Sequence, residues 1–95
     1  MCGLTGIFTQ TSLNSNSEDS LRRMGRSLVH RGPDDEGIWM DPIAGIGLAH
    51  QRLSVIDLSS EGRQPMISAS GRYVITYNGE VYNFLELRKK LDHAG

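Results

Sequence analysis

The sequence of 95 residues has a single cysteine, an aromatic content of only 6% and no apolar run longer than three residues. One cysteine cannot form an internal disulfide, which excludes a disulfide-stapled secreted domain and fits a reducing cytoplasm. A run of three is far shorter than the roughly 20 apolar residues that cross a bilayer. The start of the chain also lacks the basic and apolar regions of a signal peptide. We therefore expect a cytoplasmic protein with no membrane partner.

The chain has no excess of charge of either sign, with 10 Lys and Arg against 11 Asp and Glu. This balance argues against a nucleic-acid partner, because such binding is driven by cationic contacts to phosphate. Cys and His do not cluster at metal-ligand spacing, so we expect no metal site. The hydrophobic content of 38% and charged content of 22% are typical of a globular protein, and the length allows one small domain at most.

Apolar, β-branched and alternating stretches predict four β-strands, at residues 3–8, 37–41, 46–53 and 73–78. Residues 54–57 extend the third strand. The fourth is the strongest strand prediction, because it is rich in β-branched and aromatic residues. Turn signals follow at Asp41-Pro42 and Ser70-Gly71.

Two further segments have the apolar spacing of amphipathic helices. The first covers residues 18–29, with Ser17 as its predicted N-cap and an apolar face formed by Leu21, Met24 and Leu28. The second begins after Asn83, whose spacing to Glu86 is that of a capping box, and its apolar stripe is Phe84, Leu87 and Leu91. The order of elements predicts an α+β fold, with two helices packed on a mostly antiparallel sheet.

Cys2 is the first candidate for chemistry, since removal of Met1 before a small residue would make it the N-terminus. A terminal cysteine carries both a thiol and an α-amine. The amine has an unperturbed pKa of about 7.7–8.0, which suits a general base that deprotonates the thiol. The alternative is an incidental cysteine near a chain end, and position alone favours that interpretation.

Arg52 is the second candidate. If residues 46–53 form a strand, Ile46, Leu48, His50 and Arg52 share one face, and the two apolar residues predict that this face is buried. A buried arginine needs an anionic partner. That partner is either a substrate carboxylate held by the guanidinium fork or one of the chain's own carboxylates.

Asn78, Gly79 and Glu80 follow the strongest predicted strand. The Asn78 side-chain amide and the Gly79 N–H are donors of the kind that form an oxyanion hole. Asn-Gly is also a common hairpin turn, although here a helix rather than a strand is predicted to follow.

The segment His30–Asp34 ends the first predicted helix with a turn. The three histidines, His30, His50 and His93, would each permit a conventional Cys–His pair, and no spacing singles one out.

Four motifs occur in order along the chain: Met1-Cys2-Gly3, His30-Arg31-Gly32-Pro33-Asp34, Gln51-Arg52-Leu53-Ser54-Val55-Ile56-Asp57 and Asn78-Gly79-Glu80-Val81-Tyr82-Asn83. With them the sequence closely resembles the N-terminal glutaminase domain of glutamine-hydrolysing asparagine synthetases. That domain is a class II glutamine amidotransferase of the N-terminal-nucleophile hydrolase superfamily. The resemblance runs from residue 1 to about residue 91, and the Arg-Gly-Pro-Asp form distinguishes this branch from the hexosephosphate aminotransferases.

The resemblance implies that Cys2 attacks the side-chain amide of L-glutamine, with its own α-amine as the base, and forms a thioester that water hydrolyses to glutamate. Asn78 and Gly79 would stabilise the oxyanion, which makes Cys2, Asn78 and Gly79 the implied catalytic residues. Arg52 would hold the substrate α-carboxylate. The implied substrate-binding set is Arg52, Leu53, Ser54, Val55, Ile56, Asn78, Gly79 and Glu80. A loop of Arg31, Gly32, Pro33 and Asp34 would lie near the site.

The resemblance also implies the first half of an αββα sandwich, so that residues 1–95 are the N-terminal part of an incomplete domain. The family's ligand for the substrate amino group, an Asp, would lie beyond Gly95. A synthetase domain would follow, with ATP, Mg²⁺ and aspartate as its ligands and a homodimer as its assembly. No cofactor is expected in this segment, because it has no Gly-rich phosphate loop. Two alternatives remain: an amidotransferase of this branch with another ammonia acceptor, or a structural or binding fragment that is inactive alone.

Overall fold

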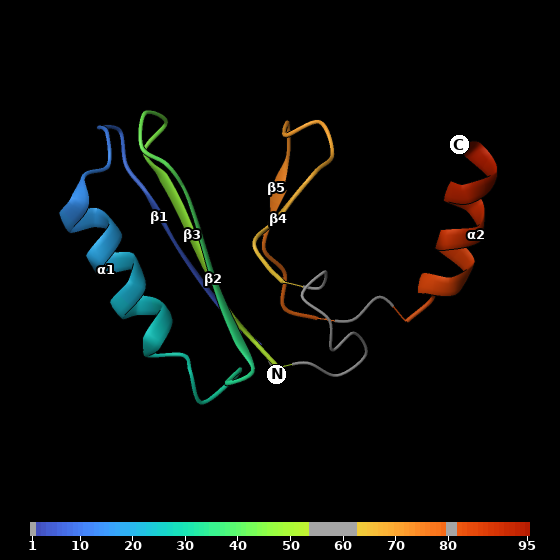
Figure 1. The fold of residues 1–95 in the computed structure, drawn as a ribbon, viewed down its shortest axis with the longest axis horizontal. Helices are drawn as coiled ribbons and strands as arrows, with labels where there is room; N and C mark the ends of the chain where they lie inside the picture. Colours follow the sequence, from blue (N-terminus) through green and yellow to red (C-terminus); the bar gives the residue numbers. More distant parts are fainter. Residues whose placement is uncertain (1, 54–62, 80–81) are drawn as a thin grey trace.

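The computed structural model describes residues 2–53, 63–79 and 82–95 of the chain (Figure 1). Within these ranges it has two helices and five strands. Their order is β1 Gly3–Phe8, α1 Ser15–Arg26, β2 Asp35–Asp41, β3 Ile46–Arg52, β4 Met66–Ile67, β5 Val74–Ile75 and α2 Phe84–Ala94. The strands form two antiparallel sheets, one of β1, β3 and β2 and one of β4 and β5. The predicted α+β fold class is therefore confirmed.

The larger sheet has β3 at its centre, and its register is fixed at both ends. Gly3 pairs with Gln51 and Phe8 with Ile46 between β1 and β3. The hairpin from β2 to β3 turns at the predicted position, where Gly45 has φ +75° and its N–H donates to the Asp41 carbonyl oxygen at 3.0 Å. The Asp41 carboxylate accepts a second bond from the Ala44 N–H at 3.1 Å. Among the described strands β1, which begins almost at the chain start, pairs only with β3 and lies at an edge of the sheet.

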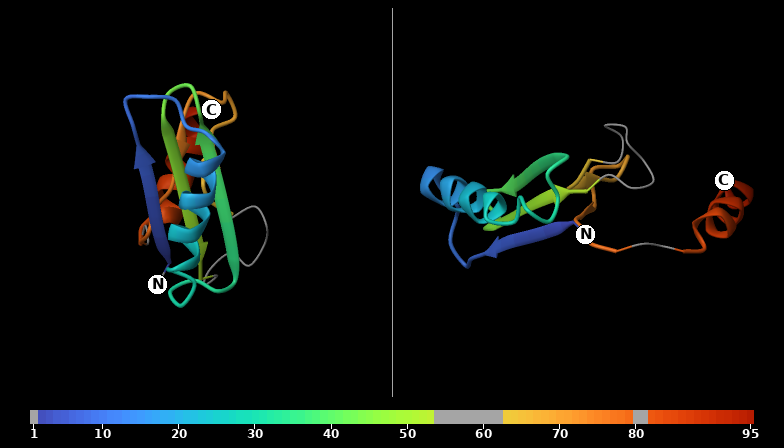
Figure 2. Two further views of the ribbon diagram at one scale, coloured as in Figure 1. Left: turned by 90° about the vertical axis from the view of Figure 1, so that its left-hand side faces the viewer. Right: turned by 90° about the horizontal axis from the view of Figure 1, so that it is seen from below.

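Helix α1 covers one face of this sheet, as Figure 2 shows. Leu21 is fully buried over Gly47, and Gly25 lies over Ala49. Because Gly25, Gly47 and Ala49 are small, the helix can approach the sheet closely. The helix thus covers the Gly47 and Ala49 face of β3 rather than the Ile46 and Leu48 face predicted to be buried, and Ile46 and Leu48 are half-buried.

The start and the end of α1 both differ from the prediction. Asn14, not Ser17, is the N-cap: its side-chain oxygen accepts from the Ser17 N–H at 3.1 Å, and the Ser17 hydroxyl accepts from the Asn14 N–H at 3.3 Å. Ser17 is therefore the reciprocal residue of a capping box, three positions into the helix. The helix ends at Arg26 rather than at residue 29, and turns carry the chain onward to Gly32.

The smaller sheet is much shorter than its sequence suggests. The strongest strand prediction, residues 73–78, is a strand only at Val74–Ile75, because its partner β4 has two residues. The turn at Ser70-Gly71 is confirmed, with Gly71 at φ +73°. The predicted strand extension at 54–57 lies outside the described residues.

Helix α2 begins at the predicted residue but without the predicted capping box. Asn83 precedes it at φ −99° and ψ 31° and makes no side-chain cap bond. This backbone is not the extended one that aims an N-cap side chain at the first turn. None of the helix's residues is buried, so its apolar stripe is exposed, and the helix lies apart from the larger sheet in Figures 1 and 2. Neither described helix has the length and apolar character needed to cross a membrane.

Candidate active site

Cys2 lies one residue beyond the β1–β3 ladder, next to the end of β3. Its Sγ accepts the Leu53 N–H at 3.3 Å and lies 3.7 Å from the Leu53 carbonyl oxygen. The Cβ position of the neighbouring Gly3 faces Leu28, on the α1 side of the sheet. Since side chains alternate, Cys2 faces the other side of the sheet. The thiol is half-buried and sits beside the strand end that carries Arg52.

The loop after α1 contacts both Cys2 and Arg52. The Arg31 Nε donates to the Cys2 carbonyl oxygen at 3.2 Å, and the Asp34 N–H donates to the Arg52 carbonyl oxygen at 2.9 Å. Between them Gly32 approaches the backbone of β3 so closely that a Cβ atom would stand 2.6 Å from the Arg52 carbonyl carbon. Only glycine fits there. The sequence prediction that this loop lies beside the site agrees with these contacts, and its role in chemistry stays a prediction.

Arg52 is 7% exposed and lies opposite Asp35 in the β2–β3 ladder. Asp35 also forms an ion pair with Arg63 at 2.8 Å. The hydrogen bond from Arg63 lowers the pKa of the Asp35 carboxyl below its ordinary 3.8, and the charges of Arg63 and Arg52 act in the same direction. The cluster of two arginines around one carboxylate has net positive charge. Asp35 is the chain's own carboxylate that could serve as the anionic partner of Arg52. A substrate carboxylate stays the other predicted partner.

Asn78 and Gly79 follow a residue that contacts β3 directly. The His50 Nε2 and the Tyr77 carbonyl oxygen are 3.2 Å apart, and the Tyr77 N–H donates to the Gln64 side-chain oxygen at 2.6 Å. Neither Asn78 nor Gly79 has the positive φ that a two-residue Asn-Gly hairpin turn of type I′ requires. The hairpin-turn interpretation is therefore wrong.

The structure brings part of the predicted site together. Hydrogen bonds join Cys2 to Leu53 and to Arg31, and join Asp34 of the same loop to Arg52. Asn78 follows Tyr77, whose carbonyl oxygen contacts His50 of β3. Four predicted residues lie outside the described ranges: Ser54, Val55, Ile56 and Glu80.

The sequence did not predict two of the residues that contact Tyr77 beside the site, His50 and Gln64. The sequence places His50 on the Arg52 face and offers it only as a partner for Cys2, not for Tyr77. Nothing in the sequence signals Gln64.

Neither His30 nor His50 bonds to the Cys2 thiol within the described ranges. His30 is exposed, and the Nε2 of His50 is engaged with Tyr77. The same ranges hold no group of His, Cys, Asp and Glu that could bind a metal ion.

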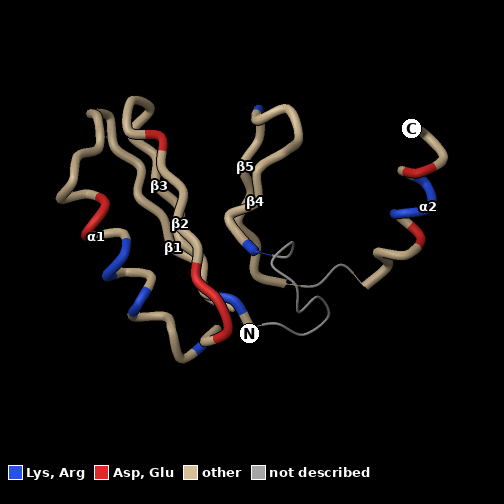
Figure 3. Tube along the Cα trace, in the orientation of Figure 1, with Lys and Arg blue, Asp and Glu red and all other residues tan. Residues whose placement is uncertain are grey.

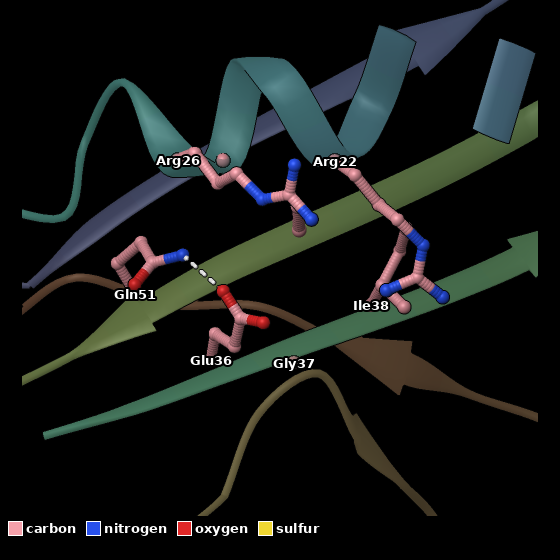
Figure 4. A pocket seen from close by; sticks show the side chains of 8 residues that line it. Arg22, Arg26, Glu36, Gly37, Ile38 and Gln51 are labelled. Carbon is pink, nitrogen blue, oxygen red and sulfur yellow. Dashed lines mark hydrogen bonds between the residues drawn. The ribbon is translucent and has the colours of Figure 1, made fainter. Parts of the chain in front are cut away.

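A cavity of about 80 Å³ lies between α1 and the sheet, on the face away from Arg52 (Figure 4). Arg22 and Arg26 of the helix border it, and Gln51 donates to the Glu36 carboxylate across its floor at 3.3 Å. Figure 3 shows these charges as basic residues along α1 and acidic residues at the start of β2. The cavity is separate from the Cys2 site, because the sheet lies between them.

Comparison with known proteins gives a consistent result. Asparagine synthetase (glutamine-hydrolysing) 1 of Bacillus subtilis is 39% identical over 97 residues, covering 100% of this chain and 15% of the relative. Putative asparagine synthetase (glutamine-hydrolysing) 2 of Methanocaldococcus jannaschii is 36% identical over 110 residues, covering 97% of this chain and 21% of the relative. Amidase chry2 of Gibberella zeae is 34% identical over 100 residues, covering 96% and 15%. The chain thus spans only 15–21% of the length of these curated relatives.

The model of one protein family, described as the glutamine amidotransferase domain, matches residues 1–95. The match covers the Cys2 end, the loop at 31–34, β3 and the segment at 78–79. The helix on an antiparallel sheet agrees with the first part of an N-terminal-nucleophile hydrolase domain. The chain therefore belongs to the glutamine amidotransferase domain family.

Proposed function

We propose that Cys2, once Met1 has been removed, is the nucleophile of a glutaminase that releases ammonia from L-glutamine. The observation that carries this proposal is the position of the thiol, beside Leu53 at the end of the strand whose last residue is Arg52. A nucleophile and a buried cation at one strand end suit a substrate with an amide at one end and a carboxylate at the other.

The reaction needs one proton carrier. The α-amine of Cys2 accepts the thiol proton, and the sulfur attacks the amide carbon of glutamine. The tetrahedral intermediate collapses with loss of ammonia, which takes up the proton from the amine. Water then attacks the thioester, which yields glutamate and restores the thiol, so that glutamine and water become glutamate and ammonia.

Asn78 and Gly79 are the proposed oxyanion donors, through the side-chain amide and the backbone N–H. Arg52 is the proposed clamp for the substrate α-carboxylate, because a guanidinium can grip both carboxylate oxygens. Leu53, Ser54, Val55, Ile56 and Glu80 complete the proposed pocket. The Leu53 N–H, which donates to the sulfur, holds the thiol at this end of the pocket.

For the whole protein we propose that the ammonia passes to an asparagine synthetase, the activity in the relatives' names. We further propose that this synthetase is ATP-dependent, uses aspartate and Mg²⁺, and works in a cytoplasmic homodimer. In this proposal residues 1–95 are the N-terminal part of the glutaminase domain, and ATP binds outside them. The similarity to amidase chry2 supports a second proposal, in which the ammonia acceptor is a compound other than aspartate. The same glutaminase half would then serve an amidation of another compound.

The test compares Cys2→Ala with unchanged protein in the full-length protein. Cys2→Ala should lose glutamate release and glutamine-dependent synthesis, while synthesis from added ammonium continues and shows that the rest of the protein is folded. Ser27→Ala, at an exposed position past α1, is the matched control. Retained glutaminase activity in Cys2→Ala would overturn the proposal.

A second experiment identifies the base. An uncleaved N-terminal extension blocks the α-amine but leaves the thiol and both histidines in place. It should abolish glutamate release if the amine is the base. Full activity of the extended protein would instead favour His30 or His50.

A further inference from the structure

His50 is one of the most deeply buried side chains of the described residues, with 1% of its surface exposed. It stands in the middle of the sheet, on the same face of β3 as Arg52. Its ladder neighbours are Leu4 on β1 and Gly37 on β2. Neither neighbour offers a polar side chain, so burial of an imidazole here costs free energy unless the ring is hydrogen-bonded.

The hydrogen bond that His50 makes fixes its tautomer. The Tyr77 carbonyl oxygen, 3.2 Å away, can only accept, so the ring proton is on Nε2. The other nitrogen, Nδ1, is buried and has no hydrogen-bond partner among the described residues. Burial also lowers the pKa of the imidazole below its ordinary 6.5, which favours the neutral ring. Burying a histidine with one unpaired nitrogen destabilises the fold. The presence of His50 at this position therefore needs a reason, and the bond made by Nε2 offers one.

The partner of that bond, Tyr77, lies in a segment that makes few other hydrogen bonds to the described residues. Strand β5 ends at Ile75, so Tyr77 lies beyond the ladder of the smaller sheet. Two side chains take the place of ladder partners there. Gln64 receives the Tyr77 N–H, and His50 donates to the Tyr77 carbonyl. Of the two, His50 belongs to the sheet that also carries Cys2 and Arg52.

The position of the Tyr77 carbonyl determines where Asn78 starts. The Tyr77 C=O and the Asn78 N–H belong to one planar peptide group, so a bond that holds the oxygen also restrains the Asn78 backbone. We infer that His50 is a positioning residue, whose Nε2–H holds the peptide before Asn78 so that the oxyanion donors stay in register with Cys2 and Arg52. This inference rests on the proposed function.

A positioning role separates two properties that a general-base role would change together. Loss of the His50 donor should slow formation of the oxyanion intermediate, since a displacement of about 1 Å in such a site can cost 100-fold in rate. The thiol itself should keep its reactivity toward iodoacetamide, because the alkylation of sulfur by iodoacetamide passes through no oxyanion. The KM for glutamine should change little, because Arg52 remains.

The experiment uses two substitutions at His50 in the full-length protein. His50→Leu removes the donor, and His50→Gln places an amide N–H near the position of Nε2. We expect His50→Leu to lower kcat for glutamate release about 10- to 100-fold, as loss or misplacement of an oxyanion donor does, with KM within about threefold. His50→Gln should recover most of kcat, and iodoacetamide should alkylate Cys2 at one rate in all three proteins.

Ala49→Gly is the matched control for stability, since Ala49 is 4% exposed on the same strand but faces α1. A wild-type kcat in His50→Leu would overturn the inference. So would an equal loss of kcat in Ala49→Gly and in both His50 variants, or slowed alkylation of Cys2. Glutaminase activity in Cys2→Ala would overturn the proposed function itself, which is a separate result.

Discussion

Arg31 donates a hydrogen bond from Nε to the main-chain carbonyl oxygen of Cys2 at 3.2 Å, although 29 positions separate the two residues. Cys2, the proposed nucleophile, is thus held from two sides, by Arg31 at its carbonyl and by Leu53 at its sulfur. The loop that ends α1 therefore does more than reverse the chain. It connects the helix end to the residue on which the proposed chemistry depends.

Replacing Arg31 should loosen Cys2 without removing any reacting group. A hydrogen bond from a charged donor contributes about 1.5–3 kcal/mol, so we expect Arg31→Leu to lower kcat for glutamate release by about tenfold or more. Steady-state kinetics of the full-length protein measure this. Arg23→Leu, at an exposed position on α1, is the control and should leave kcat unchanged. An unchanged kcat in Arg31→Leu would show that the Cys2 carbonyl needs no anchor.

Two glycine-to-alanine substitutions should have opposite effects. At Gly32 an added Cβ meets the backbone of Gln51 and Arg52, which cannot move aside, and we expect a cost of about 1–3 kcal/mol, the usual range for overpacking. At Gly25 the added Cβ meets the Ala49 Cβ at 3.4 Å, an ordinary contact, and alanine favours the helix by up to about 1 kcal/mol. Amide exchange of β1 and β3 peptides in the full-length protein measures both. Tolerance of Gly32→Ala would contradict the close packing.

His50 should make stability depend on pH in the weakly acidic range. Burial lowers its pKa in the folded state, and the Arg52 charge acts in the same direction, against the Tyr77 bond and the Asp35 charge. Below pH 6.5 the unfolded chain therefore binds the proton more readily, so stability falls as the pH drops from 6.5 through the lower folded value. Exchange rates of β3 peptides, corrected for intrinsic rates, should show this loss.

The same pH series on His50→Gln gives the comparison. The glutamine side chain does not titrate, so the fall in stability between neutral pH and pH 5 should be smaller. An equal fall in both proteins would assign the effect to other groups. The Asp35 carboxyl is not among them in this range, because its pKa lies below 3.8.

The two asparagines that precede helices should differ in their effect on stability. Asn14 caps α1 through a bond to the Ser17 N–H, so Asn14→Ala should cost about 1 kcal/mol. Asn83 makes no side-chain cap bond to α2, so Asn83→Ala should leave the stability of that helix almost unchanged. Exchange protection in the first turn of each helix is the measurement. Equal losses at the two positions would contradict the difference in capping.

The sequence predicted the elements that local patterns determine. β1, the hairpin turn at Asp41 and the start of α2 lie where residue spacing placed them, since each depends on neighbours within a few positions. The exact N-cap of α1 did not follow, because Asn14 and Ser17 are both good capping residues and only the helix geometry assigns their roles. The length of the strand at 73–78 did not follow either, because it depends on a distant partner, Met66–Ile67.

The site shows the same division between local and distant information. Cys2, Arg52 and Asn78 are singled out by residue type and motif. Their relation in space depends on the register of β1 with β3, which places Cys2 by Leu53, and on the bond from His50 to Tyr77. No local pattern encodes these contacts. The packing of α1 on Gly47 and Ala49 was missed for a similar reason: close approach by a helix favours small residues, whereas the periodicity argument looked for large ones.

The pairing of β1 with the much later β3 has a consequence for maturation during synthesis. Cys2 and Leu53 are 51 positions apart, so at about 5–20 residues per second the ribosome needs several seconds to supply the strand that holds the chain start. During that time residues 1–3 have no ladder partner and an aminopeptidase can reach Met1. After β3 arrives, Arg31 and Leu53 hold Cys2, the residue next to the scissile bond, and the ladder holds Gly3. Removal of Met1, which the proposed mechanism requires, is thus in competition with folding itself, and slow processing would leave a folded but unactivated protein.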